Sequence, residues 1–300
     1  MREIGDIVRE FERRPGERFA LATLVQTRGS SYRRPGARML IGPDGAATGS
    51  LSGGCLEDEV VEKAREVLRT GDAELMDFDT RRRFGCNGTL QILVERLSAG
   101  FLPTLAQRFQ ARRPFLIGTR FAGDCGSRFV CAADPWCDGE LRHLIEPAPL
   151  LLVIGDGPDS VALRTIAGAL GWTVRQIESA GELDGSSDSW TAAVVKTHNY
   201  GRDFAALRAL LPLDLRYIGL MGPRARRAQL LGDLLDSGIT PGPNLFAPAG
   251  LDLGGDSPEG IALAIVSEIQ AVFAGGSRQP LRERKAPIHE PNAELLAATR

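Results

Sequence analysis

Residues 150–160, LLLVIGDGPDS, place five consecutive apolar residues directly before a glycine-containing turn. An uninterrupted apolar run of this length is typical of a strand buried on both faces of a parallel sheet. Helices and strands are then expected to alternate, with helices over 158–170, 203–211, 223–237 and 258–273 and strands over 172–178, 191–196 and 215–219. This βαβ alternation predicts a Rossmann-like, doubly wound parallel-sheet domain over residues 148–275.

The residues before this domain follow a different pattern. We expect helices over 3–13, 55–68 and 103–112, and strands over 19–26, 37–41, 73–79, 89–95, 114–118 and 128–132. Pro43-Asp44-Gly45 has the turn chemistry of a hairpin. The mixture predicts an N-terminal α+β domain over residues 1–147, so the chain as a whole is of the α/β class. The polar, proline-containing tail over 276–300 is expected to be an extended arm.

Charge and composition exclude several classes of protein. Thirty-six basic and 38 acidic residues leave a net charge of -2, which provides no overall field for nucleic acid or anionic lipid. No apolar stretch approaches the ~18 residues of a membrane span, and the N-terminus lacks a signal-peptide pattern. The five cysteines are dispersed and odd in number, so reduced thiols are expected. We therefore expect a cytoplasmic protein without nucleic-acid or membrane partners.

A glycine-rich loop, residues 49–55 (GSLSGGC), leads into the helix predicted over 55–68. Successive N–H groups of small residues and the dipole of that helix favour an anion here, and the dipole also favours the thiolate form of a cysteine. The candidate cofactor contacts in this loop are Ser52, Gly53, Gly54 and Cys55. The alternative is that Cys55 is a small buried residue beside a tight turn.

Two other segments of this domain combine cations with a loop. Cys86 lies in a second glycine-containing loop, preceded by three arginines at 81–83, so a reactive thiol is expected there. The loop between the first two predicted strands is flanked by guanidinium groups, which suit phosphate and other oxyanions. These candidate cofactor contacts are Arg28, Arg33, Arg34 and Arg38. A solvated cluster of charges is the alternative for them.

The second domain offers a further set of candidates. Residues 155–160 follow a strand and open a helix, as a dinucleotide fingerprint does, but only two of its three glycines are present and Pro158 lacks an N–H. A turn that binds another ligand, or none, is therefore favoured over NAD(P). The candidate contacts of this domain lie in this turn and at later strand ends: Gly155, Gly157, His198, Gly219, Gly222 and Arg224.

Several of these segments together resemble the XdhC/CoxI family, which are maturation factors of xanthine dehydrogenase and related molybdenum hydroxylases. The resemblance rests on residues 29–39 (GSSYRRPGARM), 49–57 (GSLSGGCLE), 217–224 (YIGLMGPR) and 247–255 (APAGLDLGG). These motifs occur in the family's order over most of the chain, so the resemblance is more specific than any single glycine loop.

The resemblance implies a protein that binds the molybdenum cofactor, as molybdopterin or its dinucleotide form, with Cys55 nearest the metal. It implies that the protein protects the cofactor during sulfuration and delivers it to an apo molybdenum hydroxylase of the xanthine dehydrogenase or CO dehydrogenase type. A cysteine desulfurase and a second copy of the chain are expected as further partners. We thus expect a cofactor chaperone rather than a turnover enzyme. An NAD(P)-dependent oxidoreductase and a thiol-based sulfurtransferase acting through Cys55 stay open as alternatives.

Overall fold

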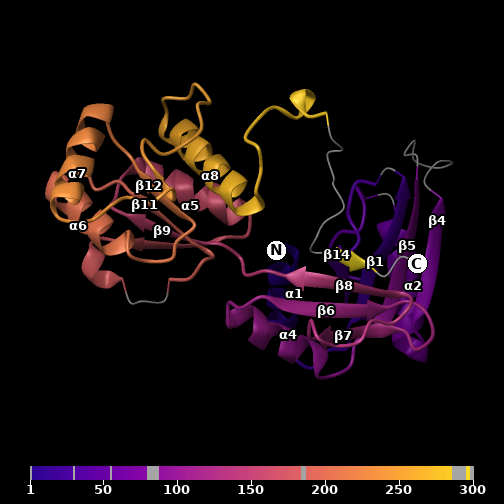
Figure 1. The fold of residues 1–300 in the computed structure, drawn as a ribbon. Coiled ribbons are helices and arrows are strands. Elements are labelled where there is room, and N and C mark those ends of the chain that lie inside the picture. Colours follow the sequence, from indigo (N-terminus) through magenta and orange to yellow (C-terminus); the bar gives the residue numbers. More distant parts are fainter. Residues whose placement is uncertain are drawn as a thin grey trace. The chain divides into compact units, whose positions relative to one another are not determined.

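The computed structural model describes residues 2–29, 31–54, 56–79, 88–183, 187–285 and 295–297. The chain divides into two compact units (Figure 1). Unit 1 comprises Met1–Pro147 with Pro287–Arg300, and unit 2 comprises Ala148–Ala286.

Unit 1 contains a five-stranded antiparallel sheet, here called the N-terminal sheet, with the strand order β3-β2-β1-β5-β4. Its strands are β1 (Ala20–Gly29), β2 (Arg38–Ile41), β3 (Ala47–Gly49), β4 (Glu74–Asp79) and β5 (Gly88–Arg96). The predicted turn at Pro43-Asp44-Gly45 joins β2 to β3, and Gly45 takes the left-handed φ of 84° that such a turn requires. Helix α2 (Glu57–Thr70) buries its apolar stripe against one face of this sheet.

A second, smaller sheet of unit 1 has the order β14-β8-β6-β7. It is formed by β6 (Phe115–Arg120), β7 (Gly126–Val130), β8 (Glu140–Ile145) and β14 (Leu295–Ala297). Helices α1 (Arg2–Arg13) and α4 (Phe101–Gln110) share one apolar cluster with residues of both sheets. The sequence did not predict β8, because its buried Glu140 and Arg142 pair with each other at 2.9 Å and mask the apolar alternation. Beyond the polar segment that was expected to be an extended arm, β14 pairs with β8.

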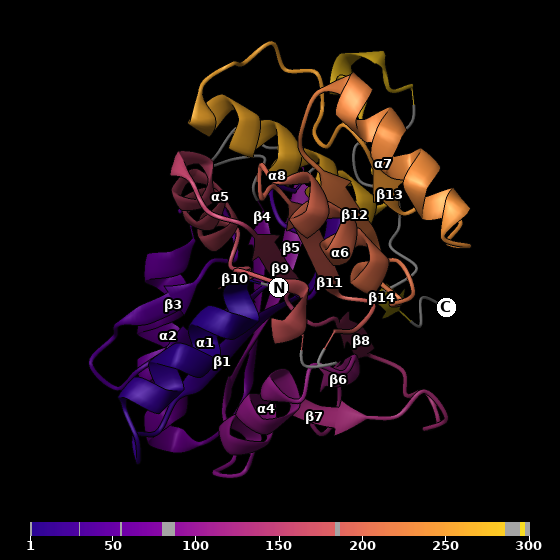
Figure 2. The ribbon, with the colours of Figure 1, turned by 90° about the vertical axis from the view of Figure 1, so that its left-hand side faces the viewer.

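Unit 2 is built on a parallel sheet with the order β10-β9-β11-β12-β13. Its strands are β9 (Leu150–Ile154), β10 (Thr173–Ile177), β11 (Thr191–Val195), β12 (Tyr217–Leu220) and β13 (Leu245–Phe246). Helices α5 (Pro158–Ala169) and α8 (Pro258–Ala274) pack on one face, while α6 (Tyr200–Leu210) and α7 (Arg224–Asp236) cover the other (Figure 2). Successive side chains of β9 enter the two apolar clusters in turn. The predicted doubly wound domain is therefore confirmed.

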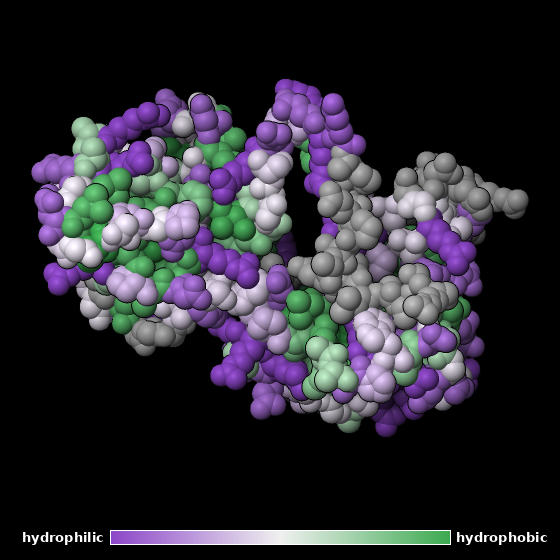
Figure 3. Space-filling model, in the orientation of Figure 1, coloured by the Kyte–Doolittle hydropathy of each residue, from purple (hydrophilic) through white to green (hydrophobic). Residues whose placement is uncertain are grey.

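The surface of each unit carries hydrophilic residues over much of the face shown in Figure 3, with apolar residues between them. The longest of the described helices, α8, has 17 residues, which corresponds to about 26 Å at 1.5 Å per residue. None of the described helices is both long enough and apolar enough to cross a membrane.

Candidate functional site

Three of the loops selected from the sequence follow strands that run in the same direction. The antiparallel pairings place β1, β3 and β4 parallel to one another within the N-terminal sheet. The connections that leave these strands contain the arginine pair 33–34, the glycine-rich residues 49–55 and Cys86 respectively. The separate motifs of the N-terminal half therefore emerge toward one end of a single sheet. Cys55 and Cys86 themselves lie outside the described residues.

The carboxylate of Glu57 organises the glycine-rich loop from the first turn of α2. It accepts hydrogen bonds from the Ser50 hydroxyl at 3.0 Å and the Leu51 N–H at 3.2 Å. The N–H and the hydroxyl of Ser52 donate to it at 2.9 and 2.7 Å, and the N–H of Leu56 donates at 3.0 Å. These contacts enclose one anion with backbone and hydroxyl donors, as the sequence predicts for this loop, but the anion belongs to the chain.

The electrostatic consequence is visible in the pKa of Glu57. Partial burial acts to raise this pKa, but the hydrogen bonds from Ser52, Leu56 and Ser50 outweigh it and lower the pKa to about 2. Glu57 therefore stays ionised at any physiological pH. The Ser52 N–H donates to Glu57 and the Gly54 N–H donates to the Ser52 hydroxyl at 3.2 Å, while Gly53 and Gly54 are exposed. The role of these three residues as cofactor contacts stays a prediction.

The four candidate arginines have different environments. The guanidinium of Arg33 pairs with Glu3 of α1, and Arg34 is partly buried. Arg38 is only 1% exposed, and its Nη1 donates to the Gly36 carbonyl at 2.9 Å and to His143 Nδ1 at 2.8 Å. Arg38 therefore lies inside unit 1, and its role as a cofactor contact stays a prediction.

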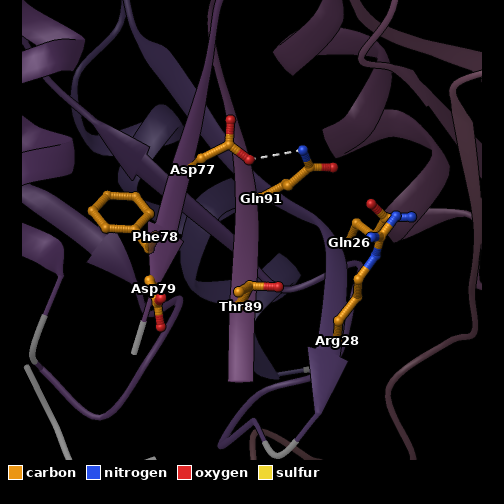
Figure 4. A pocket seen from close by; sticks show the side chains of 7 residues that line it. All are labelled: Gln26, Arg28, Asp77, Phe78, Asp79, Thr89 and Gln91. Carbon is orange, nitrogen blue, oxygen red and sulfur yellow. Dashed lines mark hydrogen bonds between the residues drawn. The ribbon is translucent and has the colours of Figure 1, made fainter. Parts of the chain in front are cut away.

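Arg28 lines a pocket formed by described residues, which has a volume of about 310 Å³ (Figure 4). Phe78 also lines the pocket, but its ring is buried in the cluster under α2, and the polar side chains of the pocket lie on the other face of the N-terminal sheet. Cross-strand register arranges its polar side chains in two rows over β1, β5 and β4. The first row is Gln26, Gln91 and Asp77, and the second is Arg28, Thr89 and Asp79.

Most of these polar side chains have few hydrogen-bond or ion-pair partners among the described residues. The Gln91 amide donates to Asp77 at 2.8 Å. No other hydrogen bond or ion pair within the described part of the chain reaches the side chains of Gln26, Arg28, Thr89 or Asp77. A concave surface with unused donors and acceptors is the usual form of a small-molecule site. The sequence analysis missed Gln26, Asp77 and Gln91, although polar residues at alternate positions of otherwise apolar strands were a signal for one polar face.

In unit 2, the side chain of Lys196, which follows the neighbouring strand β11, occupies the space beside the glycine turn after β9. Lys196 has no exposed side-chain surface and contacts Asp159 at 2.9 Å, the Ser160 hydroxyl at 2.9 Å and the Asp156 carbonyl at 2.7 Å. Gly155, with a φ of 111°, leaves no room for a side chain, since a Cβ there would lie 2.7 Å from the Lys196 carbonyl. The start of α5 thus already holds a carboxylate paired with a buried ammonium group.

The remaining candidates of unit 2 differ in exposure. His198 is exposed and takes a left-handed φ of 55°, directly after the carboxyl end of β11. Gly222 and Arg224 are exposed beyond β12. Gly219 instead lies inside β12, where a Cβ would meet the Tyr217 ring at 2.7 Å. Packing therefore requires glycine at this position, and its role as a cofactor contact stays a prediction.

The three described cysteines, Cys125, Cys131 and Cys137, are free thiols. Among the described residues, no group of three or more His, Cys, Asp and Glu side chains could hold a metal ion. The side chains that line the pocket of unit 1 offer hydrogen-bonding and charged groups.

These features define a protein made of an α+β unit with a polar pocket and a Rossmann-type unit. Residues 12–79 match the model of the XdhC and CoxI family, and residues 151–269 match that of the XdhC Rossmann domain. The two matches together span more than half of the chain, in the order expected from the motifs. The chain belongs to the XdhC and CoxI family.

Individual proteins show the same likeness over most of their length. A probable xanthine dehydrogenase subunit of Bacillus subtilis is 28% identical, over 84% of this chain and 92% of that protein. The molybdenum cofactor insertion chaperone PaoD of Escherichia coli is 25% identical, over 86% and 84% respectively. A crystal structure from Bacillus halodurans, described as a xanthine dehydrogenase, covers 93% of this chain with a TM-score of 0.78 and 23% identity. This last comparison shows a shared fold.

Proposed function

We propose that this protein binds the molybdenum cofactor and inserts it into a molybdenum hydroxylase of the xanthine dehydrogenase type. The supporting comparison is the likeness to PaoD, a molybdenum cofactor insertion chaperone, which extends over most of both chains. In the proposal the chain also shields the cofactor during sulfuration, with sulfur supplied by a cysteine desulfurase. Its partners are the apo hydroxylase and a second copy of the chain, and its location is the cytoplasm.

One structural observation carries the proposal: two family motif loops and the Cys86 loop follow parallel-running strands of one sheet, and that sheet carries the pocket. The cofactor combines a pterin, which donates and accepts hydrogen bonds, with a phosphate. The uncommitted amide of Gln26, the hydroxyl of Thr89 and the guanidinium of Arg28 match both kinds of group. The residues present therefore fit the cofactor.

The proposed assignment favours the chaperone over a dehydrogenase because of the turn after β9. Lys196 and Asp159 neutralise each other at the start of α5, where a dinucleotide pyrophosphate would otherwise be attracted. Pro158 at the first helical position has no N–H to offer.

The experiment is cofactor transfer. The chain is produced in a molybdenum-replete host, purified without oxygen, and mixed with an apo hydroxylase whose activity is followed over time. The proposal expects activity to rise in proportion to added chain, and expects no rise with chain from a host that cannot make the cofactor. Equal recovery with both preparations would contradict it.

A further inference from the structure

The two rows of polar side chains in the unit 1 pocket form a small grid over three neighbouring strands. Adjacent strands lie about 4.8 Å apart, and successive side chains on one face about 6.8 Å apart. Three strands and two rows therefore span roughly 10 Å by 7 Å, the dimensions of a fused heterocycle rather than of an isolated ion. The volume of about 310 Å³ has room for such a ring system with a short substituent.

The grid is electrically polarised across the strands. Each row has its acidic member on β4, in Asp77 and Asp79, and Arg28 on β1 is the cation among the described residues that line the pocket. A ligand that matches this arrangement has hydrogen-bond donors along one edge and a carbonyl or anionic group at the other. A uniformly anionic ligand would meet repulsion from the Asp77 carboxylate.

Asp77 is oriented for such a ligand. Its Oδ1 accepts from the Gln91 amide at 2.8 Å, and Figure 4 shows the carboxylate beside that amide on the pocket face. A carboxylate fixed at one oxygen keeps acceptor capacity at both oxygens, and can take two parallel N–H bonds from one planar group. On β1, the Arg28 side chain extends beside Gln26 on the same face (Figure 4).

We propose that this pocket recognises the 2-amino-4-oxopyrimidine edge that pterins and guanine share. Asp77 accepts from the ring N3–H and the 2-amino group, and Arg28 donates to an acceptor or anionic group at the far end of the ligand. The inference rests on the proposed function, because the molybdenum cofactor supplies this edge in its pterin, and in the guanine of one dinucleotide form.

The test measures binding of small probes to the full chain by fluorescence or calorimetry. The probes are 6-hydroxymethylpterin, 6-hydroxymethyllumazine, which has an oxo group in place of the 2-amino group, and GMP. In Asp77→Asn the amide oxygen can still accept the hydrogen bond from Gln91. The amide NH2 group then faces the N–H donors of the ligand in place of a carboxylate oxygen. Asp72→Asn is the matched control, since Asp72 is exposed and precedes β4 at the end opposite Asp79.

We expect wild type to bind the pterin at least tenfold more tightly than the lumazine. Charge-assisted hydrogen bonds are typically worth a factor of about 10 to 100 in affinity. Asp77→Asn should therefore weaken pterin binding about 10- to 100-fold and abolish the preference over lumazine, with Asp72→Asn unchanged. If only the pterin binds, and its binding depends on Asp77, the pocket is assigned to the pterin of the cofactor. If only GMP binds in this way, the pocket is assigned to the guanine of a dinucleotide cofactor.

Two results would overturn the inference: equal affinity of wild type for pterin and lumazine, or unchanged pterin affinity in Asp77→Asn with an unchanged melting temperature. Bound molybdenum in the purified chain separates this failure from failure of the proposed function. Molybdenum-loaded wild type with an Asp77-independent pterin affinity rejects the pocket and retains the function. Wild type that never carries molybdenum rejects the function itself.

Discussion

Replacing Glu57 by Gln should loosen the glycine-rich loop while leaving the rest of unit 1 folded. The folded pKa of about 2, against an ordinary 4.5, corresponds to about 3 kcal/mol if the site were fully shielded, at 1.36 kcal/mol per pKa unit. Glu57 is only partly buried, so solvent screening reduces the expected effect to about 1–2 kcal/mol. The amide group in Glu57→Gln is uncharged. Its NH2 group would also face N–H donors of the loop, which now donate to a carboxylate oxygen, and would leave them without an acceptor.

Amide hydrogen exchange of residues 50–57 measures this effect locally. A loss of about 1–2 kcal/mol lowers the protection of the Leu51, Ser52 and Leu56 amides roughly 5- to 30-fold at pH 7. Asp58→Asn is the control, because it removes an exposed negative charge from the same helical turn without touching the loop. Equal protection in wild type and Glu57→Gln, or an equal loss in both variants, would refute the reasoning.

The same measurement has a defined pH dependence. Because the folded pKa of Glu57 is lower than the unfolded one, its stabilising contribution is fully present above about pH 4.5 and is lost as the pH falls toward 2. The difference in protection between wild type and Glu57→Gln should therefore be constant from pH 7 to about pH 5 and shrink below it. A difference that persists unchanged at pH 2 would show that charge is not the cause.

Three further outcomes are expected for the folded chain. Lys196→Met leaves the Asp159 carboxylate without its buried partner and should cost unit 2 about 3 kcal/mol in chemical unfolding; an unchanged midpoint would contradict this. Burial and the nearby arginine lower the pKa of His143 to about 3. Because the unfolded chain therefore takes up a proton at a higher pH than the folded chain, wild type should lose up to about 2 kcal/mol of stability between pH 6.5 and pH 5. His143→Gln should lose less over this range, and parallel pH profiles of the two proteins would contradict this. Tyr217→Phe removes the 2.8 Å hydrogen bond to Glu268 and should lower stability by about 1–3 kcal/mol, measured by thermal unfolding, with no change as the opposing result.

Hydrophobic periodicity predicted most helices and strands, because their buried positions are apolar. It failed for β8, where the buried Glu140 and Arg142 satisfy each other. It also did not reveal that the Arg38 guanidinium lies inside unit 1 against His143. Glu140 and Arg142 pair on the same face of β8, and Arg38 bonds to His143, which is distant in sequence. A local sequence pattern reveals neither pairing.

The site was predicted in part. The glycine loop was expected to hold an anion, and the structure supplies that anion from Glu57, two residues after Cys55. The pocket was not anticipated, because Asp77 and Gln91 each follow an ordinary strand pattern by themselves. Only the register between β4 and β5 places them in one row. Strand pairing is a non-local property, so this part of the site required the structure.

In the proposed function, this chain carries the molybdenum cofactor. The most direct measurement is the molybdenum and pterin content of the chain, purified without oxygen from a molybdenum-replete host, by elemental analysis and by fluorescence of oxidised pterin. The account predicts molybdenum and pterin in equal amounts, approaching one of each per chain, with neither present after production in a host that lacks the cofactor. If the chain purified from the replete host contained neither molybdenum nor pterin at any protein concentration tested, this result would contradict the proposed function.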